Sequence, residues 1–220
     1  MTCFCLHARA QRGNYFWPID WYAVERPYIV EGTVESVRWI NCRIRIDQWI
    51  KGKSLRKHHL KFRYTFMWTH PAEEKVKSGL EKGKHYIFFL LDRYIFGEPL
   101  ILHSRYHHLP VVNDTVFIDE GFFRWVEIPD SIDICQPNPH PDPIVKYGYP
   151  MVKSEFIELI QILNAHYYYR LGKERKKAKR YGRAEPWCTV KIQDPPNNLD
   201  PVRQALVDHF EGWWEKSHCR

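Results

Sequence analysis

The sequence predicts a small β-barrel followed by C-terminal helices. Short strand patterns recur between residues 28 and 127, and helical patterns appear only after a Pro-rich stretch at residues 136 to 150. Apolar residues make up 44% and aromatic residues 15% of the 220 residues, which indicates a packed core. A chain of this length suits one domain of about 130 to 150 residues with an appendage. We therefore expect a closed or partly open barrel of about five to six strands.

Four segments carry the strongest strand patterns. Residues 28 to 38 and 42 to 50 alternate and are rich in Val and Ile, which predicts two paired strands. Residues 59 to 66 place Leu60 and Phe62 on one face and Lys61 and Arg63 on the other. Residues 86 to 91 are continuously apolar and predict the most buried strand. Weaker strands are expected at 99 to 103, 115 to 118 and 122 to 127, with turns at 113–114 and 120–121.

The pattern changes after residue 135. A proline stands at every second position from 137 to 143, which predicts an extended connector over residues 136–150. It separates a barrel at residues 1–135 from a helical extension at residues 151–220. In the extension, Ser154 is the expected cap of a helix over residues 153 to 169, which should pack on the barrel. Asp200 and Pro201 predict the start of a last helix.

The formal net charge of +7 is concentrated in one segment, which we call the basic tract. It spans residues 170 to 183, where eight basic side chains accompany one Glu, so the rest of the chain is near neutral. We expect it to be helical and to bind anions, on nucleic acid or on an anionic membrane face. The alternative is a solvated basic helix. The basic residues are Arg170, Lys173, Arg175, Lys176, Lys177, Lys179, Arg180 and Arg183.

The six cysteines are spread along the chain without a Cys-x-x-Cys pair, which argues against structural zinc and leaves disulfides or free thiols. The first residues contain no apolar stretch of signal-peptide length. We therefore expect a cytoplasmic protein if Met1 is the native start, and an exported one if the cysteines are oxidised. No apolar run reaches the roughly 18 residues of a membrane span, so no transmembrane segment is predicted.

Neither catalysis nor metal binding has a strong signal. The sequence contains no Gly-x-Ser-x-Gly, His-Glu-x-x-His or phosphate-loop motif, so we expect no enzymatic activity and no cofactor. The pairs His58-His59 and His107-His108 could each offer one ligand only, because adjacent strand residues face opposite ways, and no metal site is predicted. Aromatic residues could stack on bases or fill the core; these are Trp39, Tyr64, Phe66 and Trp68.

Several motifs occur in an order that resembles a known family. They are Cys3-x-Cys5, Gly32-Thr-Val34, Trp49-Ile-Lys51-Gly52 and Gly83-Lys-His-Tyr86-Ile-Phe88. This order is similar to that of netrin-like modules, which include the tissue inhibitors of metalloproteinases, over residues 3 to about 135. The resemblance implies a five-stranded barrel of the oligonucleotide/oligosaccharide-binding (OB) type. It also implies disulfides, for which we expect Cys3 and Cys5 to pair with Cys42 and Cys135.

One departure from the family bears on function. The inhibitors of this family use the free amino group of their first cysteine to reach a protease zinc, whereas Met1 and Thr2 precede Cys3 in this sequence. Protease inhibition by that mechanism is therefore not expected. We expect a non-catalytic binding module whose partner is a protein or an anionic surface, with loops around residues 51–57 and 69–77 and the basic tract in contact. The alternative is a single-stranded nucleic-acid-binding protein that uses the barrel face and the basic tract.

Overall fold

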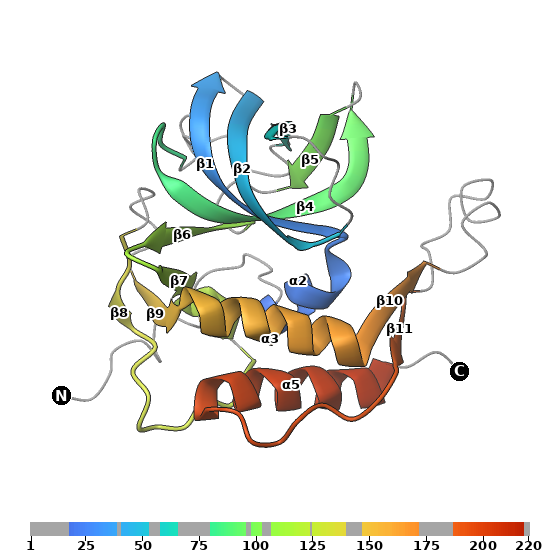
Figure 1. Ribbon diagram of the computed structural model, residues 1–220. Coiled ribbons are helices and arrows are strands. Elements are labelled where there is room, and N and C mark those ends of the chain that lie inside the picture. Colours follow the sequence, from blue (N-terminus) through green and yellow to red (C-terminus); the bar gives the residue numbers. More distant parts are fainter. Residues whose placement is uncertain are drawn as a thin grey trace, which may run out of the picture.

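The computed structural model describes residues 18–38, 41–52, 58–65, 80–95, 98–102, 107–123, 125–139, 147–171 and 187–217. Strands dominate the first part and helices the second, as predicted (Figure 1). In chain order the elements are α2 (Ile19–Glu25), β1 (Tyr28–Arg38), β2 (Asn41–Lys51), β3 (His59–Thr65), β4 (His85–Ile95), β5 (Glu98–Leu102), β6 (His108–Val112), β7 (Thr115–Asp119), the 3-10 helix η1 (Glu120–Phe123), β8 (Gln136–Pro137), β9 (Tyr147–Val152), α3 (Lys153–His166), β10 (Tyr167–Leu171), β11 (Trp187–Lys191) and α5 (Pro201–Ser217).

Nine of these strands form one sheet in the order β1-β2-β3-β5-β4-β6-β7-β9-β8. Strand β1 pairs with β2 along one edge and with β4 along the other. The pairing of β3 with β5 is parallel and the other pairings are antiparallel. Strands β10 and β11 form a separate two-stranded sheet. The protein is therefore a sheet-dominant mixed fold, and its main sheet is larger than the five to six strands that the sequence predicted.

Strand β4 is buried on both faces, which explains its continuous apolar run. Tyr86, Phe88 and Leu90 face one hydrophobic cluster, whereas Ile87 and Phe89 face another. All five are at most 1% exposed, so the prediction of a fully buried strand is confirmed. The first cluster, which we call the upper cluster, lies among β1 to β4 and contains Val30, Val34, Cys42, Ile44, Leu60, Phe62, Leu80, Tyr86, Phe88 and Leu90.

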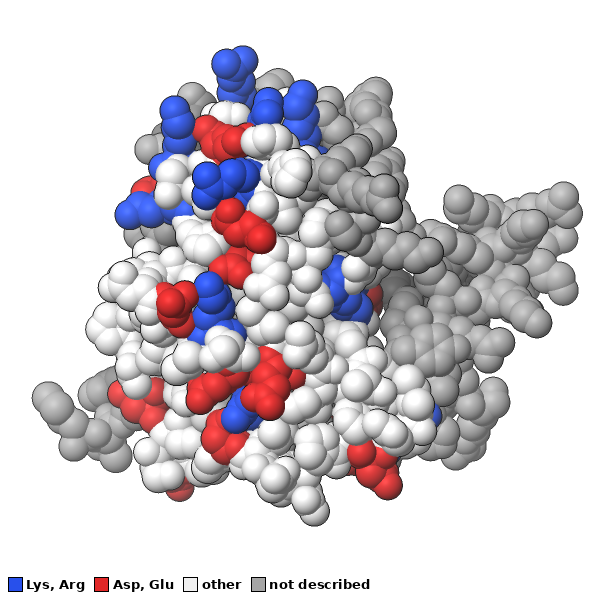
Figure 2. Space-filling view, in the orientation of Figure 1, with Lys and Arg blue, Asp and Glu red and all other residues white. Residues whose placement is uncertain are grey.

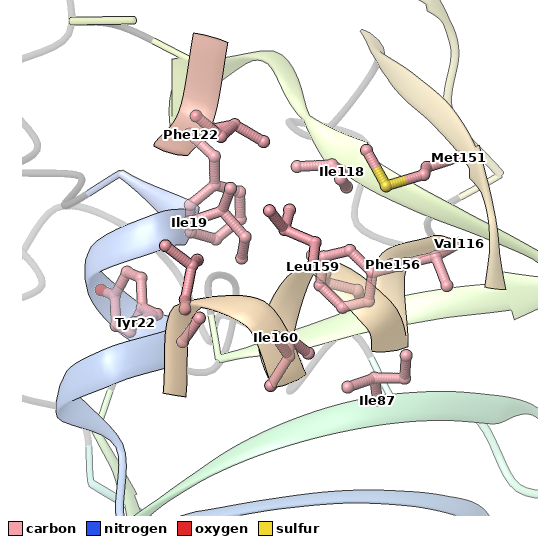
Figure 3. Packing of buried hydrophobic residues seen from close by; sticks show 14 of the residues in the cluster. Ile19, Tyr22, Ile87, Val116, Ile118, Phe122, Met151, Phe156, Leu159 and Ile160 are labelled. Atoms are coloured by element: carbon pink, nitrogen blue, oxygen red, sulfur yellow. The ribbon is translucent and has the colours of Figure 1, made fainter. Parts of the chain in front are cut away.

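The second, lower cluster joins the sheet to the helices. Helix α3 directs Phe156, Leu159 and Ile160 into it, toward Ile118 of β7 and Ile87 of β4 (Figure 3). Together with Leu163, these residues recur at intervals of three and four, which places them on one face of α3. Burial of each such side chain contributes about 1.5–3 kcal/mol relative to exposure. Helices α2 and α5 add further members, including Tyr22, Val202, Leu206 and Phe210.

The helix starts differ from each other in how they are capped. Asp200 Oδ1 accepts the backbone N–H groups of Val202 and Arg203, both at 3.1 Å, which confirms the predicted cap of α5. Helix α3 begins at Lys153, after Val152, so the predicted cap at Ser154 is wrong. The backbone N–H of Lys153 instead donates to a carbonyl oxygen outside the helix, that of Asp114, at 2.7 Å.

Two local predictions near the middle of the chain had opposite outcomes. The turn between β6 and β7 is confirmed, with Asn113 and Asp114 at φ values of 50° and 58°, as a two-residue hairpin turn requires. The strand expected at 122–127 is wrong, because residues 120–123 form η1. The Asp119 carboxylate accepts the N–H of Gly121 at 2.6 Å and thereby stabilises a turn at this point.

The described part of the Pro-rich connector belongs to the main sheet. Strand β9 pairs with β7, and Gly148 lies where an added Cβ would be 2.5 Å from the carbonyl oxygen of Ile118. This close approach explains why a glycine interrupts an otherwise strand-forming segment. Strand β9 leads directly into α3, so the connector brings the helix against the sheet. In the described ranges, no helix combines the length and apolarity needed to cross a membrane.

Candidate anion-binding face

The basic tract connects two paired strands. Helix α3 ends at His166, and the residues that were expected to continue it form β10, which pairs with β11 from Tyr167 opposite Lys191 to Leu171 opposite Trp187. The predicted helix through residue 169 is therefore wrong in its last turn. Arg170 lies in β10, and the other seven basic residues of the tract lie outside the described residues. Because the strands are antiparallel, the tract joins them at one end of a hairpin.

Helix α5 fixes the other end of this hairpin. Lys191 Nζ lies 2.6 Å from Asp194 Oδ1, pairs with Glu211 of α5, and sits 5.5 Å from the centroid of the Trp214 ring. These hydrogen bonds, first to Asp194 and then to Glu211, raise the pKa of Lys191. Tyr167 is fully buried, and its ring centroid lies 4.7 Å from that of Phe210. Packing and ion pairs therefore anchor the end of the hairpin that lies opposite the basic tract.

A second basic surface lies on the outer side of β2 and β3. The pairs Cys42–Phe62 and Ile44–Leu60 point into the upper cluster, so the residues between them point outward. In the same register Arg43 stands opposite Lys61 and Arg45 stands opposite His59, and all four are exposed. We call these four residues the basic face. Figure 2 shows Lys and Arg gathered at the β1–β5 end of the molecule, with Asp and Glu between them.

The pairing of Arg43 with Lys61 is electrostatically unfavourable. Directly opposed residues of an antiparallel pair have Cβ atoms about 4.5–5.5 Å apart, and like charges at that separation destabilise the sheet. Two acidic side chains partly offset the repulsion. Glu35 lies 2.8 Å from Arg43 and 3.0 Å from His59, and Asp47 lies 3.2 Å from Arg45. The basic face can therefore accept anionic groups, and the protein supplies two of its own.

Part of this surface was visible in the sequence. The alternation of the third strand placed Lys61 on its polar side, and Lys61 is exposed in the structure. The sequence does not show that Arg43 lies directly opposite Lys61 and Arg45 opposite His59, because this depends on the register between two strands. The anion-binding site was predicted in the basic tract because the charges of the tract are close together in the sequence. The residues of the basic face instead come from alternate positions in two separate segments.

Lys51 was expected to lie in a contact loop, but it has a structural contact instead. Its ammonium group donates to the carbonyl oxygens of Ala23 at 2.8 Å and Val24 at 2.6 Å, at the C-terminal end of α2. Burial lowers the pKa of Lys51 to about 7, an effect that the nearby Glu25 carboxylate opposes. Lys51 thus joins β2 to α2. Residues 53–57 and 69–77 of the two predicted loops lie outside the described residues.

The pair His107-His108 packs in the interior of the protein. His107 and His108 are both 1% exposed. His107 Nε2 lies 3.1 Å from the Tyr22 hydroxyl oxygen, and the His108 ring packs edge-on against Tyr86 with centroids 5.2 Å apart. Within the described ranges, no group of three or more His, Cys, Asp and Glu side chains is arranged to hold a metal ion.

Two of the four cysteines proposed for disulfides, Cys42 and Cys135, lie in described regions. Cys42 is buried in the upper cluster as a thiol, so the disulfide expected at Cys42 is wrong. Cys135 packs against the lower cluster, with its Sγ atom 3.7 Å from a carboxylate oxygen of Glu120. Cys3 and Cys5 lie outside the described residues. The side chains of all four aromatic residues proposed for stacking also lie outside the described part of the structure; these are Trp39, Tyr64, Phe66 and Trp68.

The structure is that of a sheet-dominant protein with two basic features. One is the exposed basic face on β2 and β3, and the other is the basic tract, which connects β10 to β11. No protein-family model matches the chain, and no curated protein sequence matches it. The resemblance to netrin-like modules therefore rests on the sequence motifs.

Proposed function

We propose that the protein is a non-catalytic binding module built on an OB-like barrel of the netrin type. The strand order supports this proposal. The pairings β1–β2, β2–β3, β3–β5, β5–β4 and β4–β1 return to the strand from which they start, as the pairings of a five-stranded barrel do. Strands β6 to β9 then form an extension beside the barrel, onto which the helices pack.

The partner in this proposal is anionic. The observation that carries it is the cross-strand pairing of Arg43 with Lys61 and of Arg45 with His59 on an exposed face. A protein or membrane surface rich in negative charge would relieve the repulsion within this face, and the basic tract would add attraction from the hairpin. Each Lys or Arg side chain held close to an anionic membrane contributes about 1 kcal/mol to the binding free energy.

Single-stranded nucleic acid is the second candidate, and the strand order favours it. OB-fold proteins bind oligonucleotides and oligosaccharides on the face of strands 2 and 3, and this is the strand pair that carries the basic face. Arg43, Arg45, His59 and Lys61 include no Phe, Tyr or Trp, so the described part of the face supplies mainly charge rather than a large stacking platform.

Binding at two salt concentrations tests the proposal. The protein is titrated with vesicles containing phosphatidylserine, with neutral vesicles and with a labelled oligothymidine, at about 50 and 200 mM salt. We expect binding to an anionic ligand at low salt, a steep loss of affinity at high salt, and weaker binding by Lys61→Glu. Absence of binding to every anionic ligand at low salt, or equal binding by Lys61→Glu, would contradict the proposal.

A further inference from the structure

One carboxylate oxygen of Glu35 bridges two side chains of the basic face, Arg43 and His59. Oε2 accepts from Arg43 Nε at 2.8 Å and from His59 Nδ1 at 3.0 Å. Glu35 lies at a register irregularity of β1, between Val34 and Ser36, where the strand has one residue more than its partner β2. The carboxylate therefore reaches across β2 to a residue of β3.

The bridging position is open to solvent. The Glu35 side chain is 32% exposed, and those of Arg43 and His59 are 46% and 44% exposed. Ion pairs at such exposure contribute only about 0–1 kcal/mol to stability. Replacement of the Glu35 carboxylate by an external anion would therefore reduce the free energy of unfolding only slightly.

A phosphate oxygen would make the same contacts. It offers a negatively charged acceptor of the same type, and it would meet two donors that are already held within hydrogen-bond distance of one point. We propose that Glu35 is an internal competitor that occupies one phosphate position of a single-stranded nucleic-acid site on β2 and β3. This inference rests on the proposed binding function and on its nucleic-acid candidate.

The positions of the acidic residues favour a single strand over a flat anionic surface. Glu35 and Asp47 lie among the cations on the β1 side of the basic face, where Asp47 also accepts from Thr33 Oγ1 at 3.0 Å. A flat surface would meet these two carboxylates together with the cations. A strand that runs along β3 would pass Lys61 and His59, and of the two carboxylates it would approach only Glu35.

The test compares Glu35→Gln with a matched control. Glu127→Gln removes the same charge from an exposed position outside β1, β2 and β3. Affinity for a labelled oligothymidine of about fifteen nucleotides is measured by fluorescence anisotropy over a range of salt concentrations. Circular dichroism and the midpoint of thermal unfolding establish that each variant is folded.

We expect Glu35→Gln to bind about three- to fivefold more tightly than the wild type at low salt. Its plot of log affinity against log salt should be steeper by about 0.7, because one more phosphate is neutralised. Glu127→Gln should match the wild type, and Lys61→Glu should bind more weakly with a shallower slope. Glu35→Gln that binds like the wild type, or no more tightly than Glu127→Gln, would overturn the inference.

The same experiment separates this inference from the proposal beneath it. If the wild type binds the oligonucleotide, Lys61→Glu binds more weakly and Glu35→Gln is unchanged, then the binding face stands and the competitor role of Glu35 is wrong. If the wild type does not bind the oligonucleotide at low salt, the inference and the nucleic-acid candidate are both wrong. Binding to anionic vesicles would then still support the general proposal.

Discussion

The backbone conformation and the packing around residue 52 explain why this position is a glycine. Its φ is +94°, a region that favours glycine, and an added Cβ would lie 2.5 Å from the Tyr28 ring and 2.8 Å from the carbonyl oxygen of Pro27. The preceding residue, Lys51, anchors β2 to α2 through two carbonyl oxygens. The Lys-Gly pair thus combines a helix anchor with a change of chain direction, and neither role requires a partner molecule.

The mutation Gly52→Ala should therefore destabilise the protein strongly. The backbone conformation alone costs about 1–3 kcal/mol for a residue with a Cβ, and the overlap with Tyr28 and Pro27 adds about 1–3 kcal/mol. Gly83→Ala is the matched control, because Gly83 has φ +81° but no atom within 4 Å of an added Cβ. Urea unfolding should show a clearly larger loss for Gly52→Ala, and equal losses would exclude a steric contribution at Gly52.

At this scale the sequence identified the right residues and assigned them the wrong role. Trp49-Ile-Lys51-Gly52 was recognised as a strand end, which is correct, and Lys51 was expected to face a partner. Its acceptors come from α2, 27 and 28 residues earlier in the chain, and α2 itself was not predicted because a seven-residue helix has too few turns to show a period.

Between elements, Glu31 links β1 to both β4 and α3. Its side chain is 4% exposed, with Oε1 2.9 Å from Lys153 Nζ and 3.2 Å from His85 Nε2. Lys153 also lies 2.9 Å from Asp114 Oδ1, in the turn between β6 and β7. Hydrogen bonding to His85, and then to Lys153, holds the pKa of Glu31 below its ordinary value of 4.5, although burial acts in the opposite direction. The start of α3 is thereby attached to the sheet.

The mutation Glu31→Gln should reduce stability in a pH-dependent way. A carboxyl group whose pKa is lowered in the folded state contributes stability above its unfolded pKa and loses it as the pH falls through the folded value. We expect a loss of about 1–3 kcal/mol at about pH 6, which shrinks as the pH falls through the lowered pKa of the wild-type carboxyl.

The measurement is urea unfolding of both proteins between about pH 6 and about pH 3. Glu158→Gln serves as the control, because Glu158 also pairs with a base, Arg203, but its side chain is 57% exposed. Such a pair should contribute only about 0–1 kcal/mol. A difference between wild type and Glu31→Gln that stays constant from about pH 6 to pH 3 would show that the ionised carboxylate is not the stabilising form.

Elements with a strong period of their own were predictable, and elements defined by pairing were not. Strands β1 to β4 and the start of α5 agree with the sequence pattern to within a few residues. Strand β6 was missed because Pro110 interrupts a short segment that begins with two histidines, and β9 because Gly148 and Pro150 lie within it. Strand β10 was assigned to a helix because only its pairing with β11 distinguishes it from the preceding turns.

For the whole molecule, the chain forms two hydrophobic clusters that share two strands. Strands β1 and β4 each supply residues to the upper and the lower cluster, for example Val30 and Ile29 in β1. The sequence predicted a barrel and a separate helical extension. The extension packs its helices on the lower cluster, to which β4 also contributes Ile87 and Phe89. The two clusters are therefore connected through β1 and β4, because each cluster contains side chains from both strands.

This connection predicts cooperative unfolding, and two adjacent residues of β4 test it. Phe88 and Phe89 are both fully buried, but Phe88 faces the upper cluster and Phe89 the lower one. Replacing either with Ala should cost about 3–5 kcal/mol. Because β4 belongs to both clusters, each variant should still unfold in one transition, with coincident curves from far-ultraviolet circular dichroism and intrinsic fluorescence. Two separated transitions in Phe88→Ala, with the later one unchanged from the wild type, would show instead that the helices and β6 to β9 fold as an independent unit.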